Sequence, residues 1–129
     1  MQFIVDSNKS VAQAAADLAK AVAAHGFGVL HVYDLKQTLA SKGVELPNEC
    51  RIFDVCNPRQ ASKVLQNDMN LSVALPCRIA VYEADGRTRV ATLRPTELLA
   101  TLSDDPRLTD TAVDVETAIE AMIEEAARH

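Results

Sequence analysis

The chain of 129 residues has no Trp, only three Phe and two Tyr, and no run of basic side chains. Its Lys and Arg residues number 13 against 18 Asp and Glu, which gives a net charge of −5. Nucleic-acid-binding proteins use basic patches and aromatic stacking platforms, so we do not expect this protein to bind nucleic acid. No apolar run approaches the roughly 20 residues that a membrane span needs, so we also expect no membrane association.

The sequence lacks the common catalytic and metal-binding patterns as well. It contains no GxGxxG, P-loop, GxSxG or HExxH motif, and no CxxC pair with zinc-site spacing. The N-terminal stretch reaches Asp6 before an apolar signal-peptide core could form. We therefore expect a cytoplasmic protein with no metal site and no catalytic residues, more consistent with a non-enzyme than with an enzyme. Whether the protein uses a cofactor, and which, is unknown from the sequence.

The composition is that of an ordinary globular domain. Hydrophobic residues make up 48% of the chain and charged residues 24%, and neither linkers nor repeats interrupt it. A chain of this length can bury a sizeable core without disulfides or metals. We therefore expect one domain over residues 1–129.

Local patterns alternate between strand and helix along the chain. Strands are expected at residues 3–6, 28–34, 51–56, 76–84 and 87–93, and helices at 12–24, 35–42, 58–65, 96–102 and 115–126. Asp85-Gly86 is a strong hairpin-turn signal, so the last two strands should pair antiparallel. This order predicts an α+β fold, with a mixed, mostly antiparallel sheet of about five strands and helices packed on it.

The most suggestive local motif is Cys56-Asn57-Pro58. It places a thiol at the end of a strand, directly before a helix that Asn57 caps and Pro58 begins. The free N–H groups and the dipole of a helix N-terminus stabilise an anion, which would lower the pKa of the Cys56 thiol. The alternative is that Cys56 packs as a small apolar side chain, with Asp54 on the same strand face opposing a thiolate.

A second motif, Pro76-Cys77, begins the next predicted strand. Cys77 alternates with Ile79 and Val81, so core packing is the simplest interpretation. If the two strand ends meet, the two thiols approach each other, and Cys50 is a third thiol along the chain. The His31 side chain is expected to be partly buried on the face of its strand that also carries Val29 and Tyr33.

In combination these motifs resemble the domain of unknown function 302 family. The similarity rests on Cys56-Asn57-Pro58 and Leu75-Pro76-Cys77 about twenty residues apart, and on the stretches Gly26–Val29 and Lys42–Val44. The resemblance implies a compact α+β fold and a dimer, but no activity. The chain departs from the family pattern at Cys50, Asp54 and Arg78. The last two, beside the motifs, could pair with each other.

Three functions are consistent with these observations. The first is a homodimeric, non-enzymatic module that binds a small ligand or partner at the junction of the two motifs. Its candidate ligand-binding residues are Cys56, Asn57, Pro58, Pro76 and Cys77; Cys56 would contact the ligand, and the helix that Asn57 caps would hold its negative group. The second is a thiol-based redox or transfer protein that uses Cys56 with Cys77 or Cys50. The third is metal or haem binding through the thiols and His31.

Overall fold

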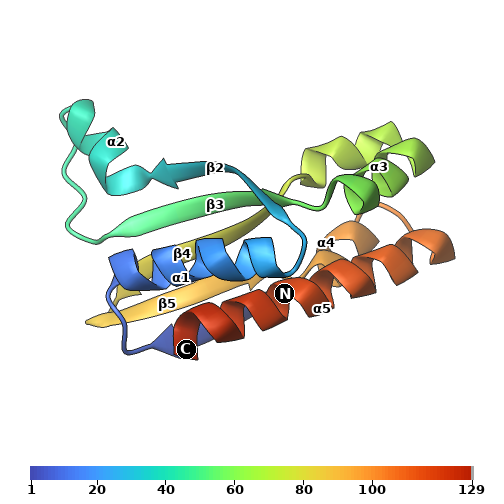
Figure 1. The fold of residues 1–129 in the computed structure, drawn as a ribbon. Coiled ribbons are helices and arrows are strands. Elements are labelled where there is room, and N and C mark those ends of the chain that lie inside the picture. Colours follow the sequence, from blue (N-terminus) through green and yellow to red (C-terminus); the bar gives the residue numbers. More distant parts are fainter. Residues whose placement is uncertain (129) are drawn as a thin grey trace.

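Five antiparallel strands form the framework of the fold (Figure 1). A computed structural model describes residues 1–128 of the chain. The strands are β1 (Gln2–Ser7), β2 (Gly28–Asp34), β3 (Cys50–Cys56), β4 (Cys77–Ala84) and β5 (Arg87–Leu93), in the spatial order β1-β5-β4-β3-β2. The predicted α+β class and the sheet of five strands are confirmed, and every pairing in the sheet is antiparallel.

The helices lie between the strands and after the last one. They are α1 (Val11–Ala24), α2 (Leu35–Ser41), α3 (Pro58–Asn67), the 3₁₀ helix η1 (Met69–Ala74), α4 (Pro95–Ala100) and α5 (Pro106–Arg128). The helix expected at residues 115–126 is longer than predicted, because α5 runs without a break from Pro106. No helix within residues 1–128 has the length and apolar character that crossing a bilayer requires.

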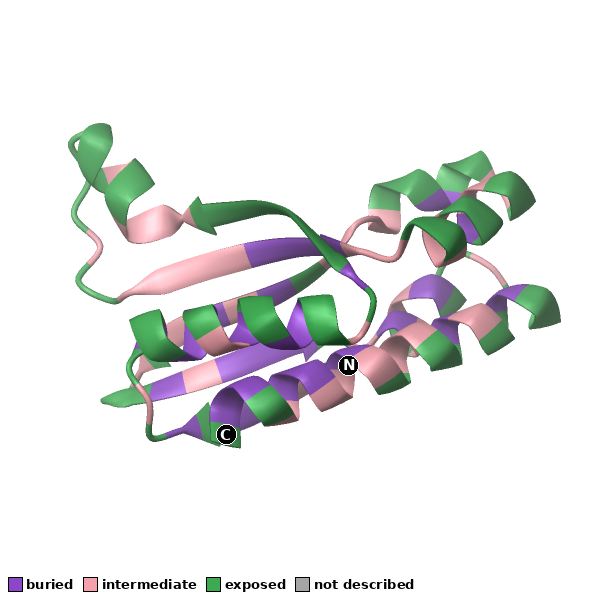
Figure 2. Ribbon diagram, viewed as in Figure 1, coloured by how far each residue is buried: buried purple, intermediate pink, exposed green. Residues whose placement is uncertain are grey.

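One face of the sheet is covered by α1 and α5, which lie side by side in Figure 1. The side chains of β4 point alternately to the two faces of the sheet. Ile79 and Val81 are fully buried beneath the helices, whereas Arg78 is exposed on the other face. Small side chains such as Ala14 and Ala126 let these elements approach closely. We call this assembly of α1, α5 and the sheet the main core; Figure 2 shows its buried residues in purple.

A second cluster of buried residues lies at the opposite end of the molecule. It is formed by Val64 of α3, Leu71 of η1, Leu99 of α4, and Leu108 and Ala112 of α5. α5 therefore belongs to both clusters, its C-terminal half to the main core and its first turns to the second cluster.

The local signals explain where most elements begin and end. Asn57, like the residues that cap α1 and α2, accepts a hydrogen bond from the first turn of its helix. The turn between β4 and β5 has positive φ at both Asp85 (54°) and Gly86 (74°), as a tight hairpin requires.

Strand β2 differs from its prediction. Its register with β3 shifts between Val29 and His31, so Val29 pairs with Val55 whereas His31 pairs with Asp54. The expected common face of Val29, His31 and Tyr33 is therefore wrong, because a bulge moves one residue out of the alternation. His31 is also exposed rather than partly buried, since β2 is an edge strand with few covering side chains.

Candidate functional site

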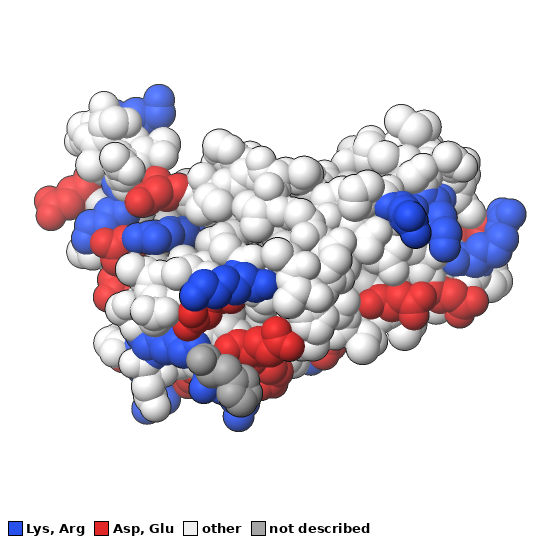
Figure 3. Space-filling model, in the orientation of Figure 1, with Lys and Arg blue, Asp and Glu red and all other residues white. Residues whose placement is uncertain are grey.

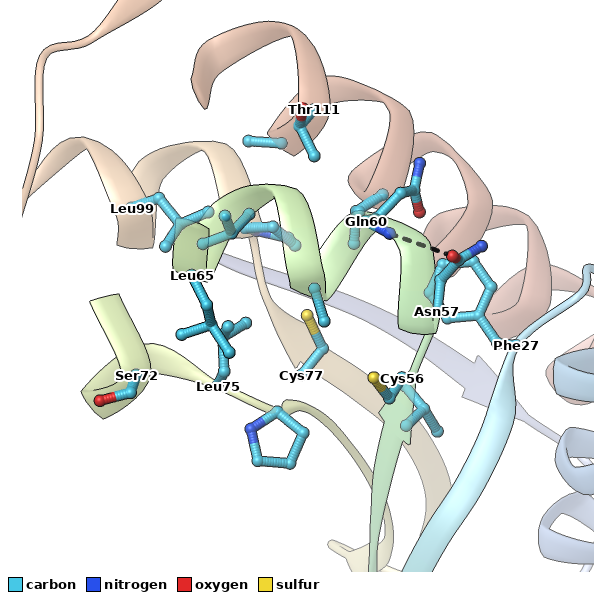
Figure 4. Close-up of a pocket in the computed structure, with 17 residues that line it drawn as sticks. Phe27, Cys56, Asn57, Gln60, Leu65, Ser72, Leu75, Cys77, Leu99 and Thr111 are labelled. Carbon is cyan, nitrogen blue, oxygen red and sulfur yellow. Dashed lines mark hydrogen bonds between the residues drawn. The ribbon is translucent and has the colours of Figure 1, made fainter. Parts of the chain in front are cut away.

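The two cysteine motifs lie on neighbouring strand ends. Val55 is the register partner of Cys77, so the last residue of β3, Cys56, lies beside the first residue of β4. Figure 4 shows the sulfur atoms of Cys56 and Cys77 beneath α3. The junction that the sequence only suggested is therefore present in the fold, and antiparallel pairing of β3 with β4 creates it.

A cavity of about 290 Å³ opens at this junction. α3 forms one wall, the strand ends form the floor, and α4 and α5 form the far side (Figure 4). Its lining is almost entirely apolar, and no Asp, Glu, Lys, Arg or His of the described chain contributes to it. A site of this kind binds apolar surface and is poorly suited to acid–base chemistry.

Four of the five predicted site residues line this cavity, namely Cys56, Asn57, Pro76 and Cys77. The peptide bond between Leu75 and Pro76 is cis. Pro58 is not among the lining residues; it occupies the first position of α3, where its missing N–H leaves no helical hydrogen bond unmade.

Asn57 caps α3 as the sequence indicates. Its side-chain oxygen Oδ1 accepts hydrogen bonds from the backbone N–H groups of Arg59 (3.1 Å) and Gln60 (3.2 Å). These are the N–H groups that would have held the negative group of a ligand. Because Asn57 already occupies them, the predicted anion-binding role of this helix end has no support in the geometry.

Burial sets the protonation of the two cavity thiols. It raises the pKa of Cys56, and it raises the pKa of Cys77 from 9.0 to about 11, with a smaller contribution from the neighbouring Cys56. The sequence argument expected the opposite direction for Cys56, from the dipole of α3. Burial of the thiol has a larger effect on its pKa than the dipole of α3, since desolvation disfavours the charged form.

Cys50 lies away from this site. It begins β3 and pairs with Tyr82, whereas Cys56 ends the same strand. Six residues of extended chain separate the two thiols by about 20 Å at ~3.3 Å per residue. A disulfide requires Cα atoms within about 7 Å, so Cys50 cannot join Cys56 in one.

The structure adds residues that sequence reasoning missed. Gln60 lines the cavity from α3, and its side-chain oxygen Oε1 is buried without a hydrogen-bond partner among the described residues. Leu99 of α4 and Val115 of α5 form the far side. Neither Gln60 nor Leu99 is singled out in the sequence analysis, and Val115 is placed only at the start of the helix expected at residues 115–126.

A second hollow of about 400 Å³ adjoins the first. Residues Leu75–Cys77, Pro95 and Leu99 contribute to the walls of both. The second hollow continues to Arg78, near the start of β4, and along α4 to Leu102.

Asp54 and Arg78 pair across the strands, as the sequence suggested they could. Arg78 Nε donates to Asp54 Oδ1 at 3.3 Å; the Arg78 side chain is 69% exposed and the Asp54 side chain 8% exposed. The neighbouring Asp54 carboxylate also raises the pKa of the Tyr33 hydroxyl. The described chain contains no cluster of three or more His, Cys, Asp or Glu side chains arranged to hold a metal ion.

Comparison with known proteins supports one family. The profile of the domain of unknown function DUF302 matches residues 3–126. The chain belongs to the DUF302 family. It is similar to a solved structure described as an uncharacterized conserved DUF302 protein from Bacillus stearothermophilus, with 29% identity, a TM-score of 0.90 and 98% coverage of each chain. No curated protein matches.

Proposed function

We propose that this DUF302 protein is a cytoplasmic, homodimeric binding module without catalytic activity, whose cavity accommodates a small, mainly apolar ligand. The observation that carries the proposal is the cavity of about 290 Å³ where the two cysteine motifs meet. Its size lies at the lower edge of the ~300–1,000 Å³ range of ligand sites. The buried, unpaired Gln60 Oε1 supports a ligand with one hydrogen-bond donor.

The role proposed for Cys56 and Cys77 is to contact the ligand as neutral thiols. Their raised pKa values favour the protonated form at neutral pH, in which a thiol behaves as a small apolar group. Pro76 shapes the wall between the strand ends, and Asn57 holds the first turn of α3 over the cavity.

Binding of N-phenyl-1-naphthylamine, a neutral fluorescent probe with one N–H donor, tests this proposal. We expect saturable binding at one site per chain, with a dissociation constant in the micromolar range. Ala61→Leu fills the cavity from α3 and should weaken binding about tenfold or more, because Ala61 is a lining residue. The control Ser62→Leu adds the same side chain at the next, exposed position. Absence of saturable binding, or equal affinities of the two variants, would reject the proposal.

The homodimer is proposed to form along β2. This strand is at the edge of the sheet, and it exposes apolar side chains such as Leu30, which is 61% exposed. Figure 3 shows an uncharged surface over β2 between the charged groups around α2 and those along α5. Unpaired strand edges are templates for pairing with a second chain, and a twofold axis would join two such edges.

Light scattering coupled to size-exclusion chromatography measures this directly. A mass of twice 14.0 kDa is expected for the natural chain, and Leu30→Lys should reduce it to the monomer. Val44→Lys, at another exposed apolar position outside β2, is the matched control and should remain dimeric. A monomeric natural chain would exclude the dimer.

A thiol-based redox or transfer function that uses Cys56 with Cys77 is the alternative. The adjacent strand ends favour it, since they bring the two thiols together. The raised pKa of both thiols opposes it, because the thiolate is the reactive form. Labelling with iodoacetamide as a function of pH separates the two functions. A Cys56 midpoint well below 8 would favour the redox function, and midpoints above the ordinary thiol range favour the binding module.

A further inference from the structure

The second hollow lies directly beside the cavity. The two hollows have Leu75–Cys77, Pro95 and Leu99 in common as lining residues, and the second has a volume of about 400 Å³. Taken as one site, they run from α3 past Leu75–Cys77 to Arg78 and Leu102. An elongated site of this kind suits a chain-like molecule better than a compact one.

The outer hollow has an unusually apolar border. Val73 is 80% exposed, and Leu93 and Leu102 are each nearly half exposed, yet all three line this hollow. Single exposed apolar side chains are common on protein surfaces, but their concentration along one hollow marks a binding surface. The apolar part of a ligand would therefore remain in contact with protein along its whole path.

Arg78 is the one charged residue among those of the described chain that line either hollow. Of its nitrogen atoms, only Nε donates a hydrogen bond to another side chain of the described residues, that of Asp54, and the Arg78 side chain is largely exposed. An arginine side chain has five N–H donors in a planar fork that matches a carboxylate or phosphate group. The open end of the site is thus complementary to a negative charge.

We propose that the two hollows form one site for an anionic amphiphile: an apolar chain that ends in a carboxylate, phosphate or sulfate group. The chain lies in the inner cavity and along the shared wall, and the anionic head binds Arg78. This inference rests on the function proposed above for the inner cavity, and it adds the class of ligand. The Asp54 carboxylate, which accepts a hydrogen bond from Arg78 Nε, competes with the head group for the guanidinium.

Displacement of N-phenyl-1-naphthylamine by three compounds with the same ten-carbon chain tests the proposal. Decanoate carries a negative head, decanol a neutral one and decyltrimethylammonium a positive one, and all are used below the concentration at which they form micelles. We expect decanoate to displace the probe at about fivefold lower concentration than decanol, the effect of one exposed ion pair, and the cation to be weakest.

The outcomes separate this inference from the function on which it rests. If the probe binds but the three compounds displace it equally, the inner cavity remains a site and the anionic head is rejected. If the probe itself does not bind, both proposals fail. Co-sedimentation with vesicles of phosphatidylglycerol provides a further test. If the protein pellets with the vesicles but monomeric decanoate does not displace the probe, the apolar surface binds a membrane, and the inference is overturned.

Two variants locate the head group. Arg78→Gln should remove the preference for decanoate over decanol, whereas Arg87→Gln, at an exposed position outside both hollows, should retain it. Because Arg78→Gln leaves the buried Asp54 carboxylate unpaired and could unfold the chain, Asp54→Asn provides an independent measure. It frees the guanidinium and should strengthen decanoate binding about threefold without changing decanol binding. Unchanged decanoate affinity in Asp54→Asn would contradict binding at Arg78.

Discussion

The two ends of this small protein are packed differently. In the main core, α1 and α5 seal one face of the sheet, and several large side chains such as Leu18 and Ile119 have no exposed surface. The second cluster has five buried residues on four helical segments, and two hollows lie beside it. Exposed apolar side chains border the outer hollow. One end has the packing density that stabilises a fold, and the other retains the space that a ligand needs.

The elements at the two ends account for this difference. The long helices α1 and α5 and the strands β4 and β5, of eight and seven residues, give the main core continuous apolar stripes. At the other end the chain passes through α3, the six-residue η1 and the six-residue α4, each too short to present a long stripe. We therefore expect the short helices around the second cluster to open locally at lower free energy than the main core does.

The largest expected difference between the two ends is in the cost of removing a buried side chain. Ile119→Ala should lower the free energy of unfolding by about 2–5 kcal/mol, since the main core cannot collapse around the cavity that remains. Leu99→Ala should cost about 2 kcal/mol, because Leu99 already borders both hollows.

Urea denaturation of the two variants, followed by circular dichroism, gives both values and their m-values. Each change ends in Ala within a helix, so the change in helix propensity is similar. Equal losses would show that the second cluster is as tightly packed as the main core.

The pH dependence of stability tests the burial of Cys77, which lines the cavity. Because the pKa of Cys77 is about 11 in the folded chain, the folded thiol keeps its proton while the unfolded one ionises near 9. Stability should therefore be unaffected below about pH 8 and should fall as pH rises from 9 to 11, by about 2 kcal/mol.

The matched variant is Cys77→Ala, which removes the titrating group. Its stability should decline less than that of the natural chain over the same pH interval, although its stability at pH 7 is lower. Cys50→Ala removes a thiol far from the cavity and serves as the control. A parallel decline in the natural chain and in Cys77→Ala would show that Cys77 is not protected from ionisation.

Much of the fold could be predicted because its signals are local. Asn57 before Pro58 specifies a helix start within a few residues, and Asp85-Gly86 specifies a hairpin without reference to the rest of the chain. The bulge in β2 carries no such signal. It depends on how β2 aligns with β3, and the alternation of apolar residues alone gave the wrong face for Val29.

The candidate site was predictable only in part. The motifs around Cys56 and Cys77 are visible in the sequence, but their contact follows from the register between Val55 and Cys77. The far wall comes from α4 and α5, which are remote in the sequence. The direction in which the thiol pKa values shift also depends on burial in the tertiary structure, which cannot be inferred from the position of Cys56 before a helix N-terminus.

The smallest expected effect concerns the attachment of α4 to α5. Arg94, at the N-cap of α4, makes no side-chain capping bond, and Glu116 of α5 takes that role by accepting hydrogen bonds from the N–H and hydroxyl groups of Thr96 (3.1 and 2.7 Å). Glu116→Gln retains an acceptor but loses the charge near the helix end, so it should cost about 0.5–1 kcal/mol.

This loss should be local to the second cluster. Amide hydrogen exchange should accelerate in residues 95–102, whose Leu99 borders both hollows, and remain unchanged in α1 and in β3–β5. Asp114→Asn, an exposed change on the same helix, should leave both regions unaltered. Faster exchange throughout the sheet in Glu116→Gln would mean that the two ends unfold as one unit, and the hollows would then lie in the same cooperative structure as the main core.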